Sequence, residues 1–184
     1  DINLIMSIIG RAYFSGGCFW CTEAIYKRLI GVLSVKPGYS GGNIKNPSYK
    51  EVCAGRTGHA ETIEVIYDSG QIDFKLLLEV FFKTHDPTTL NRQGNDIGTH
   101  YRSIVFYSNS NEKKLIINYI ELLNKKIYDN KIVTEILEFD KFYEAEDYHE
   151  NYYELNKKQP YCDLVITPKV EKFENNYKNK LISG

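Results

Sequence analysis

The stretch RAYFSGGCFWCTEAIYKRLIGVLSVK, residues 11–36, decides how the chain is expected to fold. A short apolar run gives way to two glycines and then to apolar positions that recur every three to five residues, which is the spacing of a helix. Gly31 ends that pattern, and a second apolar run follows it. The expected elements are a strand at 11–15, a turn at Gly16 and Gly17, a helix at 18–30 and a strand at 32–36. A strand, a helix and a strand in succession indicate a sheet covered by helices.

The rest of the chain continues this alternation. Further strands are expected at 61–68, 103–107 and 133–139, and helices at 74–84, 111–127 and 145–158. Asp73 is expected to cap the first of these helices. Segments 37–48 and 85–101 are rich in Gly, Pro, Asn and Asp and are expected to be loops, and the tail from Pro160 is expected to be mostly irregular. The predicted fold class is α+β, a two-layer sandwich of helices on a sheet.

Composition and charge exclude several classes of protein. The 184 residues are the length of one domain, so we expect 1–184 to fold as a single unit. Hydrophobic residues make up 42% and charged residues 26%, which is the balance of a globular protein and not of a disordered one. A formal charge of −1 provides no field for a nucleic acid, and no apolar stretch approaches the roughly 20 residues of a membrane helix. We therefore expect neither nucleic acid nor membrane as a partner.

The cysteines and the first residues indicate a compartment. Two of the four cysteines are three residues apart, which favours reactivity or metal binding over a secreted disulfide framework. The opening DINLIMSIIGR has no basic leader and no small-residue cleavage site, so we read no export signal. The prediction is a cytoplasmic protein.

Cys18 is the most informative residue, because it follows two glycines and opens the expected helix. Unpaired amide groups and the positive end of the helix dipole favour a thiolate there. The thiolate is the nucleophilic form of cysteine. We expect a lowered thiol pKa and a catalytic role for Cys18, against the alternative that it is a small buried hydrophobic residue.

Phe19, Trp20 and Cys21 follow Cys18 directly. Two aromatic side chains beside a nucleophile could line an apolar pocket for a small uncharged group, although such a pair is more often part of a core. Cys21 completes a Cys-x-x-Cys, a spacing shared by redox and metal sites. A zinc site would need two more ligands, and neither Cys53, Cys162 nor the four histidines form a second close pair.

Three other kinds of polar residue stand out less. Glu61 opens an expected strand, and in an apolar pocket its carboxyl would be neutral at pH 7 and could donate a proton. Asp96 and Tyr101 lie in the longest expected loop, and Tyr49 lies just after the other. Each of these residues alone would be unremarkable.

Four longer motifs are more specific. The runs GGCFWCTEAIY, GYSGGNIKNPSYKEVCAGRTGHAE, HDPTTLNRQGNDIGTHYRS and EDYHENYYELNKKQPYC resemble the peptide methionine sulfoxide reductase A family in order and spacing. The resemblance extends from about residue 11 to residue 173. Such reductases return methionine sulfoxide to methionine, with one enzyme for each sulfoxide epimer. The resemblance implies the S epimer as substrate and a ferredoxin-like α+β core.

The resemblance also implies roles for individual residues. Cys18 corresponds to the family's nucleophile, and Glu61 to the acid that protonates the sulfoxide oxygen. In the same way Phe19 and Trp20 match the methyl-binding aromatic wall, Tyr49 and Tyr101 the partners of the sulfoxide oxygen, Asp96 the carboxylate that orders its loop and the pocket, and Cys162 the cysteine that resolves the oxidised nucleophile.

The chain departs from the family pattern at three places. Cys21 stands where Gly is usual, so a second candidate resolving thiol lies beside the first. The tail lacks the Gly-rich segment with two cysteines that many members have, and His100 stands where Gln is common. A disulfide needs Cα atoms within about 7 Å, which a mobile tail can reach. This reach, together with the resemblance, favours a Cys18–Cys162 disulfide over a Cys18–Cys21 disulfide.

The predicted activity is thiol-dependent reduction of free or protein-bound methionine-S-sulfoxide, through a sulfenic acid on Cys18 and then a disulfide. Thioredoxin or another dithiol reductant would restore the enzyme, no metal or organic cofactor has a role, and we expect a monomer. The alternative enzyme is a thiol–disulfide oxidoreductase that uses Cys18 and Cys21. The alternative without catalysis is a metal-binding module of Cys18, Cys21, Cys53 or Cys162 and a histidine.

Overall fold

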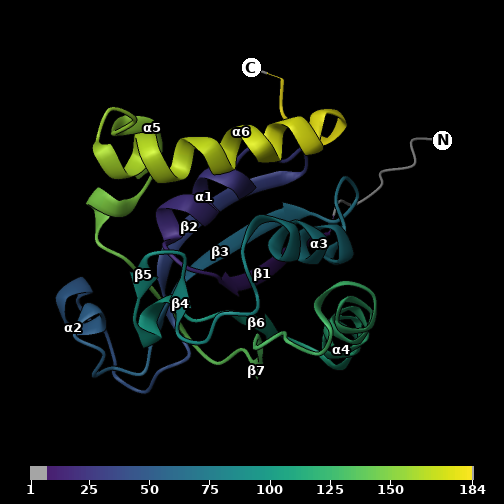
Figure 1. The fold of residues 1–184 in the computed structure, drawn as a ribbon, viewed down its shortest axis with the longest axis horizontal. Coiled ribbons are helices and arrows are strands. Elements are labelled where there is room, and N and C mark those ends of the chain that lie inside the picture. Colours follow the sequence, from purple (N-terminus) through teal and green to yellow (C-terminus); the bar gives the residue numbers. More distant parts are fainter. Residues whose placement is uncertain (1–7, 184) are drawn as a thin grey trace.

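A six-stranded sheet runs through the middle of the protein in the order β7-β6-β1-β3-β2-β8 (Figure 1). The structure is a computed structural model that describes residues 8–183. The strands of the sheet are β1 (Ile9–Ser15), β2 (Val32–Ser40), β3 (Ala60–Asp68), β6 (Ile104–Tyr107), β7 (Glu135–Glu138) and β8 (Phe142–Glu144), and a separate small pair consists of β4 (Arg92–Gln93) and β5 (Asp96–Ile97). Neighbouring strands are antiparallel except for β6 and β7, which are parallel.

The helices lie between these strands and after them. They are α1 (Phe19–Tyr26), α2 (Tyr49–Cys53), α3 (Phe74–Thr84), α4 (Ser110–Leu123), α5 (Tyr152–Leu155) and α6 (Thr167–Asn176), with short 3₁₀ turns η1 (Thr99–Tyr101), η3 (Asp147–His149) and η5 (Lys178–Lys180) and π-helical turns η2 (Asn124–Tyr128) and η4 (Cys162–Ile166). The helix predicted at 74–84 is confirmed at both ends, and the Asp73 side chain caps it by accepting a hydrogen bond from the Leu76 amide at 2.8 Å. The mixed α/β class is thereby confirmed.

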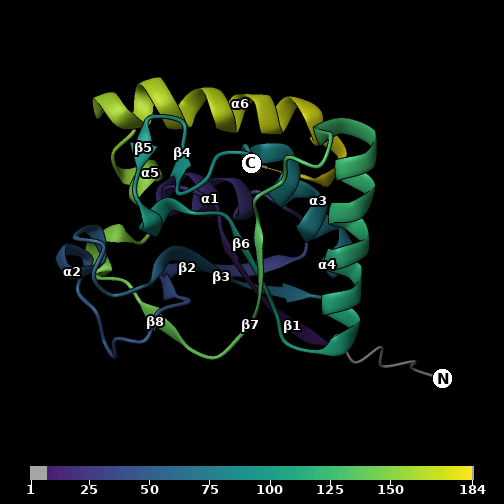
Figure 2. The same cartoon turned by 60° about the horizontal axis from the view of Figure 1, so that its bottom comes forward.

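One face of the sheet carries most of the core. Alternate residues of β1 and β3, such as the paired Phe14 and Ile63, are fully buried against α1 and α3. Figure 2 shows these two helices on one side of the strands, with α6 beyond them. On the other face Tyr13 stacks on Phe139, with ring centroids 3.7 Å apart. The helix-covered face therefore holds the N-terminal end of α1, and with it Cys18, against the sheet.

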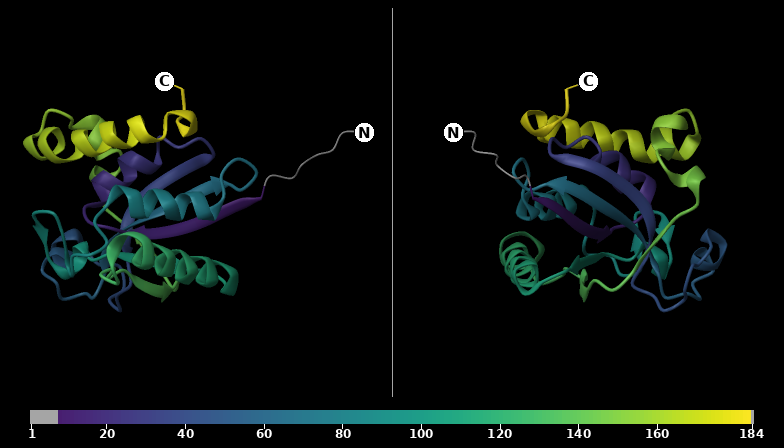
Figure 3. Two further views of the ribbon diagram at one scale, coloured as in Figure 1. Left: turned by 45° about the vertical axis from the view of Figure 1, so that its right-hand side comes forward. Right: turned by 180° about the vertical axis from the view of Figure 1, so that it is seen from behind.

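Residues 145–183, which we call the C-terminal arm, differ most from expectation. The predicted helix at 145–158 is wrong: η3 and the short α5 stand there, because Asn151 adopts a left-handed conformation with φ of 56° between them. The predicted irregular tail is also wrong, since η4, α6 and η5 occupy it. Pro168 lies in the first turn of α6, where a missing amide costs nothing. Figure 3 shows the arm rising from the β8 edge of the sheet to lie along α1.

Smaller differences have local causes. The helix predicted at 18–30 ends at Tyr26, and β2 continues to Ser40 through a segment predicted as loop. The Pro37 carbonyl faces the β8 side of β2 and accepts a hydrogen bond from the Ala145 amide. The proline nitrogen points to the same side, so its missing hydrogen removes no bond to β3, and the strand tolerates the proline. The loop predicted at 85–101 contains the β4–β5 pair and η1. Among residues 8–183, no helix has the length and apolar character that crossing a membrane requires.

Candidate active site

Cys18 stands at the N-terminal end of α1, as predicted, and is 8% exposed. The turn before it depends on two glycines. Gly17 has φ of 88°, which side chains other than glycine rarely adopt. A Cβ atom on Gly16 would lie 2.8 Å from the Phe81 ring, and one on Gly17 would lie 2.7 Å from the Gln93 side chain. The glycine pair therefore lets the backbone reach the helix start through the narrow space beside Phe81 and Gln93.

Glu61 lies on β3 beside the start of α1. Its side chain is 2% exposed, and its Oε1 accepts a hydrogen bond from the Phe19 amide at 3.2 Å. Among the described residues, Oε2 has no hydrogen-bond partner. Burial raises the pKa of Glu61 to about 8. The carboxyl is therefore mostly protonated at neutral pH and can give up a proton to a group that enters the site.

Tyr49 and Tyr101 bring phenol groups toward Glu61 from two separate segments. Tyr49 is the first residue of α2, which Ser48 caps, and Tyr101 is the last residue of η1. Burial, reinforced by the nearby Glu61 carboxylate, raises the pKa of both phenols well above the ordinary value. Both hydroxyl groups therefore stay protonated and can donate hydrogen bonds.

Phe19 and Trp20 form the aromatic side of the site. Phe19 is buried, while Trp20 is partly exposed. The indole of Trp20 stacks on Tyr152, with ring centroids 3.7 Å apart, and its Nε1 donates a hydrogen bond to Nδ1 of His149 at 3.0 Å. His149 also packs against Phe19, with ring centroids 4.9 Å apart. The indole is therefore fixed on two sides while one side remains open.

Three residues near Trp20 were not expected from the sequence: His149, Tyr152 and Tyr161. All three lie in the fourth motif, EDYHENYYELNKKQPYC. His149 is fully buried, and its Nε2 has no partner among the described residues. A cluster of tyrosine and histidine in a charged segment was the available signal, but it does not say which aromatic side chain meets the tryptophan.

Asp96 is linked to the site through Tyr161. Its Oδ2 accepts a hydrogen bond from the Tyr161 hydroxyl at 2.5 Å. The Tyr161 ring approaches Trp20 edge-on, with centroids 6.0 Å apart, and Tyr161 is one of the groups that help to lower the pKa of Cys21. Asp96 thus fixes Tyr161, which packs near the tryptophan.

The two cysteines of the Cys-x-x-Cys are buried together. Burial raises the pKa of the Cys18 thiol, and the neighbouring Cys21 and Glu61 raise it further. The expectation that the helix N-terminus lowers this pKa is wrong here, because loss of solvent outweighs the helix dipole. A hydrogen bond from Cys18 instead lowers the pKa of Cys21. Cys21 is therefore the thiol of the pair that ionises first.

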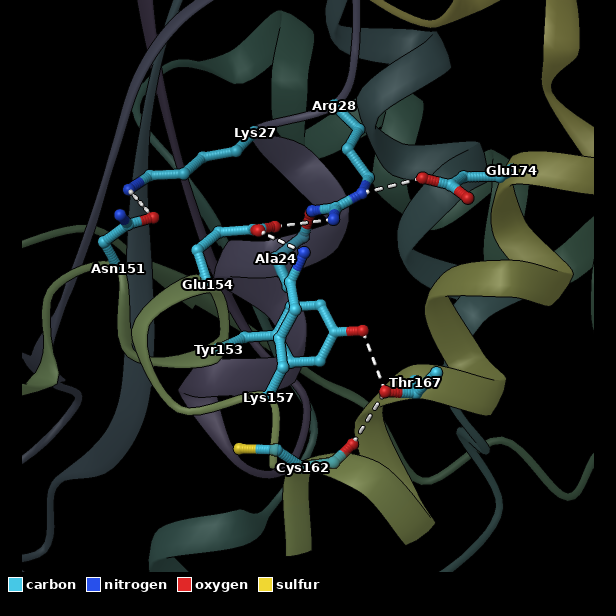
Figure 4. A network of polar contacts seen from close by, with 10 residues as sticks. All are labelled: Ala24, Lys27, Arg28, Asn151, Tyr153, Glu154, Lys157, Cys162, Thr167 and Glu174. Carbon is cyan, nitrogen blue, oxygen red and sulfur yellow. Dashed lines mark hydrogen bonds and ion pairs between the residues drawn. The ribbon is translucent and has the colours of Figure 1, made fainter. Parts of the chain in front are cut away.

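Cys162 lies in η4 and is fully buried in the same core cluster as Cys18 and Cys21. Its carbonyl accepts a hydrogen bond from the Thr167 hydroxyl at 3.1 Å, and Tyr153 donates to that hydroxyl at 2.8 Å (Figure 4). The premise that Cys162 lies on an irregular tail is therefore wrong. The Cys18–Cys162 disulfide itself stays a prediction.

Arg28 ties the C-terminal arm to α1 in the same region (Figure 4). Its guanidinium contacts Glu154 at 2.6 Å and Glu174 at 2.9 Å, and donates to the Ala24 carbonyl at 2.7 Å. We call Arg28, Glu154 and Glu174 the Arg28 clamp. The clamp holds α5 and α6 to the helix that begins at Cys18.

We call the side chains of Cys18, Phe19, Trp20, Tyr49, Glu61 and Tyr101 the substrate pocket. Cys53 is exposed at the other end of α2 from Tyr49. Within residues 8–183 no three His, Cys, Asp or Glu side chains are placed to hold a metal ion. The pocket thus combines a thiol, a neutral acid, two phenols and an aromatic wall, which is a set suited to a small, polar but uncharged group.

Comparisons with known proteins agree with this chemistry. The family model described as peptide methionine sulfoxide reductase matches residues 10–181. Proteins named peptide methionine sulfoxide reductase MsrA from Saccharolobus solfataricus and Sulfolobus acidocaldarius are each 54% identical, over 92% of this chain and 96% of their own.

Solved structures give the same result. Mxr1 from Saccharomyces cerevisiae in reduced form is 36% identical with a TM-score of 0.78, over 84% of this chain and 89% of its own. Methionine sulfoxide reductase A of Corynebacterium diphtheriae is 35% identical with a TM-score of 0.77, over 80% of this chain and 75% of its own. The chain belongs to the peptide methionine sulfoxide reductase family.

Proposed function

We propose that this protein reduces the S epimer of methionine sulfoxide, free or within proteins, with Cys18 as nucleophile and Glu61 as acid. The observation that carries this proposal is the buried Glu61 carboxyl, which lies beside the start of α1 and has a pKa of about 8. A sulfoxide is uncharged, and its oxygen is a poor leaving group until it gains a proton. A protonated acid beside a thiol meets that requirement.

The rest of the substrate pocket would bind and orient the sulfoxide. The hydroxyl groups of Tyr49 and Tyr101 stay protonated and would donate hydrogen bonds to the sulfoxide oxygen. Phe19 and Trp20 would bury the methyl group, which is worth about 0.8 kcal/mol for a CH₂-sized group. Aromatic rings also make favourable contacts with sulfur. Asp96 acts through Tyr161, which packs near Trp20.

The first step transfers oxygen from the substrate to the enzyme. Cys18 Sγ attacks the sulfoxide sulfur as Glu61 protonates the oxygen, and the thiol proton of Cys18 passes to the neighbouring Cys21, whose lowered pKa favours its thiolate form. The S–O bond of the substrate then breaks, methionine leaves, and Cys18 is left as a sulfenic acid. The substrate sulfur gains the two electrons that Cys18 loses.

Recycling begins with a second thiol. The Cys21 amide donates a hydrogen bond to the Cys18 carbonyl at 3.1 Å, and both side chains are buried, whereas the Cys162 backbone is held by Thr167 and Tyr153. We therefore place Cys21 as the first resolving thiol. The Cys18–Cys162 disulfide favoured by the family resemblance then requires η4 to move. Cys162, whose pKa is raised by burial and further by Cys21, can act in a later exchange with Cys21.

A dithiol protein such as thioredoxin would restore the reduced enzyme. One solved structure shows Mxr1 from Saccharomyces cerevisiae in complex with Trx2, and it shares the fold of this chain with a TM-score of 0.56. No metal or organic cofactor has a part in the proposed steps. A monomeric state and a cytoplasmic location stay predictions from the sequence.

The central strands and helices have the arrangement of a known type of α+β core. We propose a ferredoxin-like core made of β1, α1, β2, β3, α3 and β6 in a single domain. The order β6-β1-β3-β2, with every neighbour antiparallel, supports this core. On this view α4, β7 and the C-terminal arm are additions at its edges.

The proposed function is tested by steady-state turnover with the separate R and S sulfoxides of N-acetylmethionine, using thioredoxin and its reductase. We expect turnover with the S epimer and none above background with the R epimer. Insulin disulfide reduction under the same conditions tests the alternative of a thiol–disulfide oxidoreductase. Insulin reduction without turnover of either sulfoxide would overturn the proposal.

A further inference from the structure

His149 lies in the turn η3 of the C-terminal arm and meets the aromatic side of the substrate pocket. It is fully buried, and its Nδ1 accepts the hydrogen bond from Nε1 of the Trp20 indole at 3.0 Å. Its ring packs against Phe19 with centroids 4.9 Å apart and against Tyr49 with centroids 4.5 Å apart. One histidine of the arm therefore contacts three side chains of the pocket, which come from two helices.

The hydrogen bond determines which nitrogen of this imidazole carries the proton. Nδ1 can accept only when it has no proton, so the proton of the neutral ring is on Nε2. Burial lowers the pKa of His149, although the charge of Glu146 opposes the shift, and the ring is neutral at pH 7. Nε2 has no acceptor within residues 8–183. Among the described residues, the imidazole therefore makes its side-chain hydrogen bond to the indole alone.

The contacts of Trp20 with Tyr152 and with His149 constrain the indole in different ways. Trp20 and Tyr152 stack with centroids 3.7 Å apart and planes inclined by 11°, which sets the plane of the indole. Stacking favours parallel, offset rings but does not select one rotation within that plane. A hydrogen bond is directional and weakens steeply as its angle departs from linearity. His149 therefore sets the rotation that the stack leaves free.

We propose that His149 is a positioning residue for sulfoxide reduction, which orients the Trp20 indole so that the aromatic wall can bury the methyl group of the substrate. This inference rests on the proposed function, because the wall has that role only if a methyl sulfoxide enters the pocket. The groups that touch the substrate remain those of the substrate pocket, and His149 acts through Trp20. The wall is therefore completed by a residue of the C-terminal arm.

The proposed role concerns binding and not the chemical step. Cys18 stands at the helix start that its two glycines allow, and Glu61 accepts its hydrogen bond from the Phe19 amide at 3.2 Å. Neither arrangement includes a hydrogen bond to His149. Loss of the indole orientation should therefore weaken substrate binding and leave the rate of the bound complex nearly unchanged.

Three variants separate the hydrogen bond from the packing of the ring. His149→Phe keeps an aromatic ring beside Phe19 and Tyr49 but has no acceptor. His149→Asn loses the ring but keeps an acceptor, because the asparagine Oδ1 is as many bonds from the backbone as Nδ1 of histidine. The matched control Tyr148→Leu removes the ring that packs against His149 with centroids 4.1 Å apart, and leaves the hydrogen bond in place. Circular dichroism checks that each variant is folded.

The first readout follows the hydrogen bond itself, without substrate. Trp20 is the only tryptophan in the chain, so its indole gives one N–H signal in a proton–nitrogen NMR spectrum. We expect that proton to exchange with solvent about tenfold faster in His149→Phe, because a lost hydrogen bond removes its protection. In His149→Asn and Tyr148→Leu the exchange rate should stay close to that of the natural protein.

The second readout is single turnover with the S sulfoxide of N-acetylmethionine, which excludes the recycling steps. In His149→Phe the half-saturating concentration should rise about fivefold, the size of one ordinary hydrogen bond. The rate constant at saturation should change little. His149→Asn should restore most of the binding, and Tyr148→Leu should leave it unchanged.

A Trp20→Phe background sharpens the comparison. A phenyl ring has no N–H group whose direction must be set, so His149→Phe should have little further effect on binding there. The effects of the two substitutions should therefore not add.

Three results would overturn the proposal. They are faster indole exchange in His149→Phe with unchanged binding, an equal loss of binding in Tyr148→Leu, and full additivity with Trp20→Phe, of which the last two indicate a general effect of packing. If His149→Phe does not fold, His149→Asn decides, since a fivefold loss of binding beside a protected indole proton would contradict the role. Failure of the proposed function looks different, because the natural protein would then release no methionine while the indole exchange still responded to His149→Phe.

Discussion

The substrate pocket and the C-terminal arm are held in different ways. The pocket takes Glu61 from a central strand and Cys18 from a helix start packed on the sheet, and a backbone amide links the two segments. The arm has short helices and turns, and charged side chains such as those of the Arg28 clamp hold it to α1. The residues proposed for sulfoxide reduction are therefore held by the central sheet. The arm, which carries Cys162 for the later disulfide steps, is held by ion pairs near the surface.

This contrast agrees with the order of the reaction. Sulfoxide reduction needs a pocket that exists before substrate arrives, because the acid, phenols and thiol must converge on one small group. Recycling requires the sulfur atoms of Cys18, Cys21 and Cys162 to approach one another in successive steps. Cys162 lies in a π-helical turn of the arm. Such turns frequently mark functional sites in helices.

The largest effect is expected at the pocket. Cys18→Ser should abolish sulfoxide reduction while the fold stays intact, because an alcohol supplies almost no anion near neutral pH without a strong base. Product formation by chromatography and far-ultraviolet circular dichroism together check this prediction. Turnover close to that of the natural protein would remove Cys18 from its role.

Glu61→Gln should lower the rate of reduction by about 10²–10⁴, the range for general acid catalysis. In the natural protein kcat/KM should fall as pH rises through about 8, since the neutral carboxyl is the active form. The variant should lack that fall. A loss of less than threefold, or an unchanged pH profile, would contradict the role of Glu61.

Glu61→Gln should also change how the free energy of unfolding depends on pH. Because the folded-state pKa of Glu61 is raised, the folded protein holds a proton that the unfolded chain has released between about pH 4.5 and pH 8. The free energy of unfolding therefore falls as pH rises through this window. Urea unfolding should show Glu61→Gln to be more stable than the natural protein at pH 8, and a less stable variant would contradict the burial of a neutral acid.

Trp20→Ala tests the border between pocket and arm, since Trp20 belongs to the pocket but rests on Tyr152 of the arm. We expect KM for the sulfoxide to rise about tenfold, which is the loss of roughly 1.4 kcal/mol of binding. The rate at which a small alkylating agent modifies the Cys18–Cys21 pair should change little, and Trp20→Phe should restore most of the binding. Loss of both properties together would indicate that Trp20 is chiefly core.

The smallest effect is expected at the Arg28 clamp. Arg28→Ala should lower the free energy of unfolding by about 1 kcal/mol, because partly exposed ion pairs contribute little each. Lys36→Ala, which removes the more exposed ion pair with Glu144, is the matched control and should cost less. If the arm moves in recycling, Arg28→Ala should also speed the appearance of a disulfide that includes Cys162. A slower appearance would argue for a clamp that aligns Cys162.

Local signals explain which parts of this structure were predictable. The helix after Asp73 has a capping residue and a strong apolar face, and both of its ends were predicted. The position of Cys18 followed from its two glycines. The substrate pocket residues came from motifs of the family, and the structure adds the partners that no motif named, such as His149 and Tyr152 against Trp20.

The parts that failed depend on contacts distant in sequence. Nothing local shows that Asn151 turns left-handed between η3 and α5. The tail did carry a usable pattern, since Ile166, Val170, Phe173 and Tyr177 recur at three and four residues, but the proline and the charges around them obscured it. The raised pKa of Cys18 could not be predicted from the sequence either, because it results from burial in the folded chain.

The most direct test of the account isolates the first step. The variant with both Cys21→Ser and Cys162→Ser keeps Cys18 but lacks both candidate resolving thiols. Mixed with the S sulfoxide and without reductant, it should release one methionine per chain and then stop, and mass spectrometry with a sulfenic acid trap should find the label on Cys18. Release of no methionine, or a label on Cys53 in place of Cys18, would contradict the claim that Cys18 takes the oxygen from the substrate.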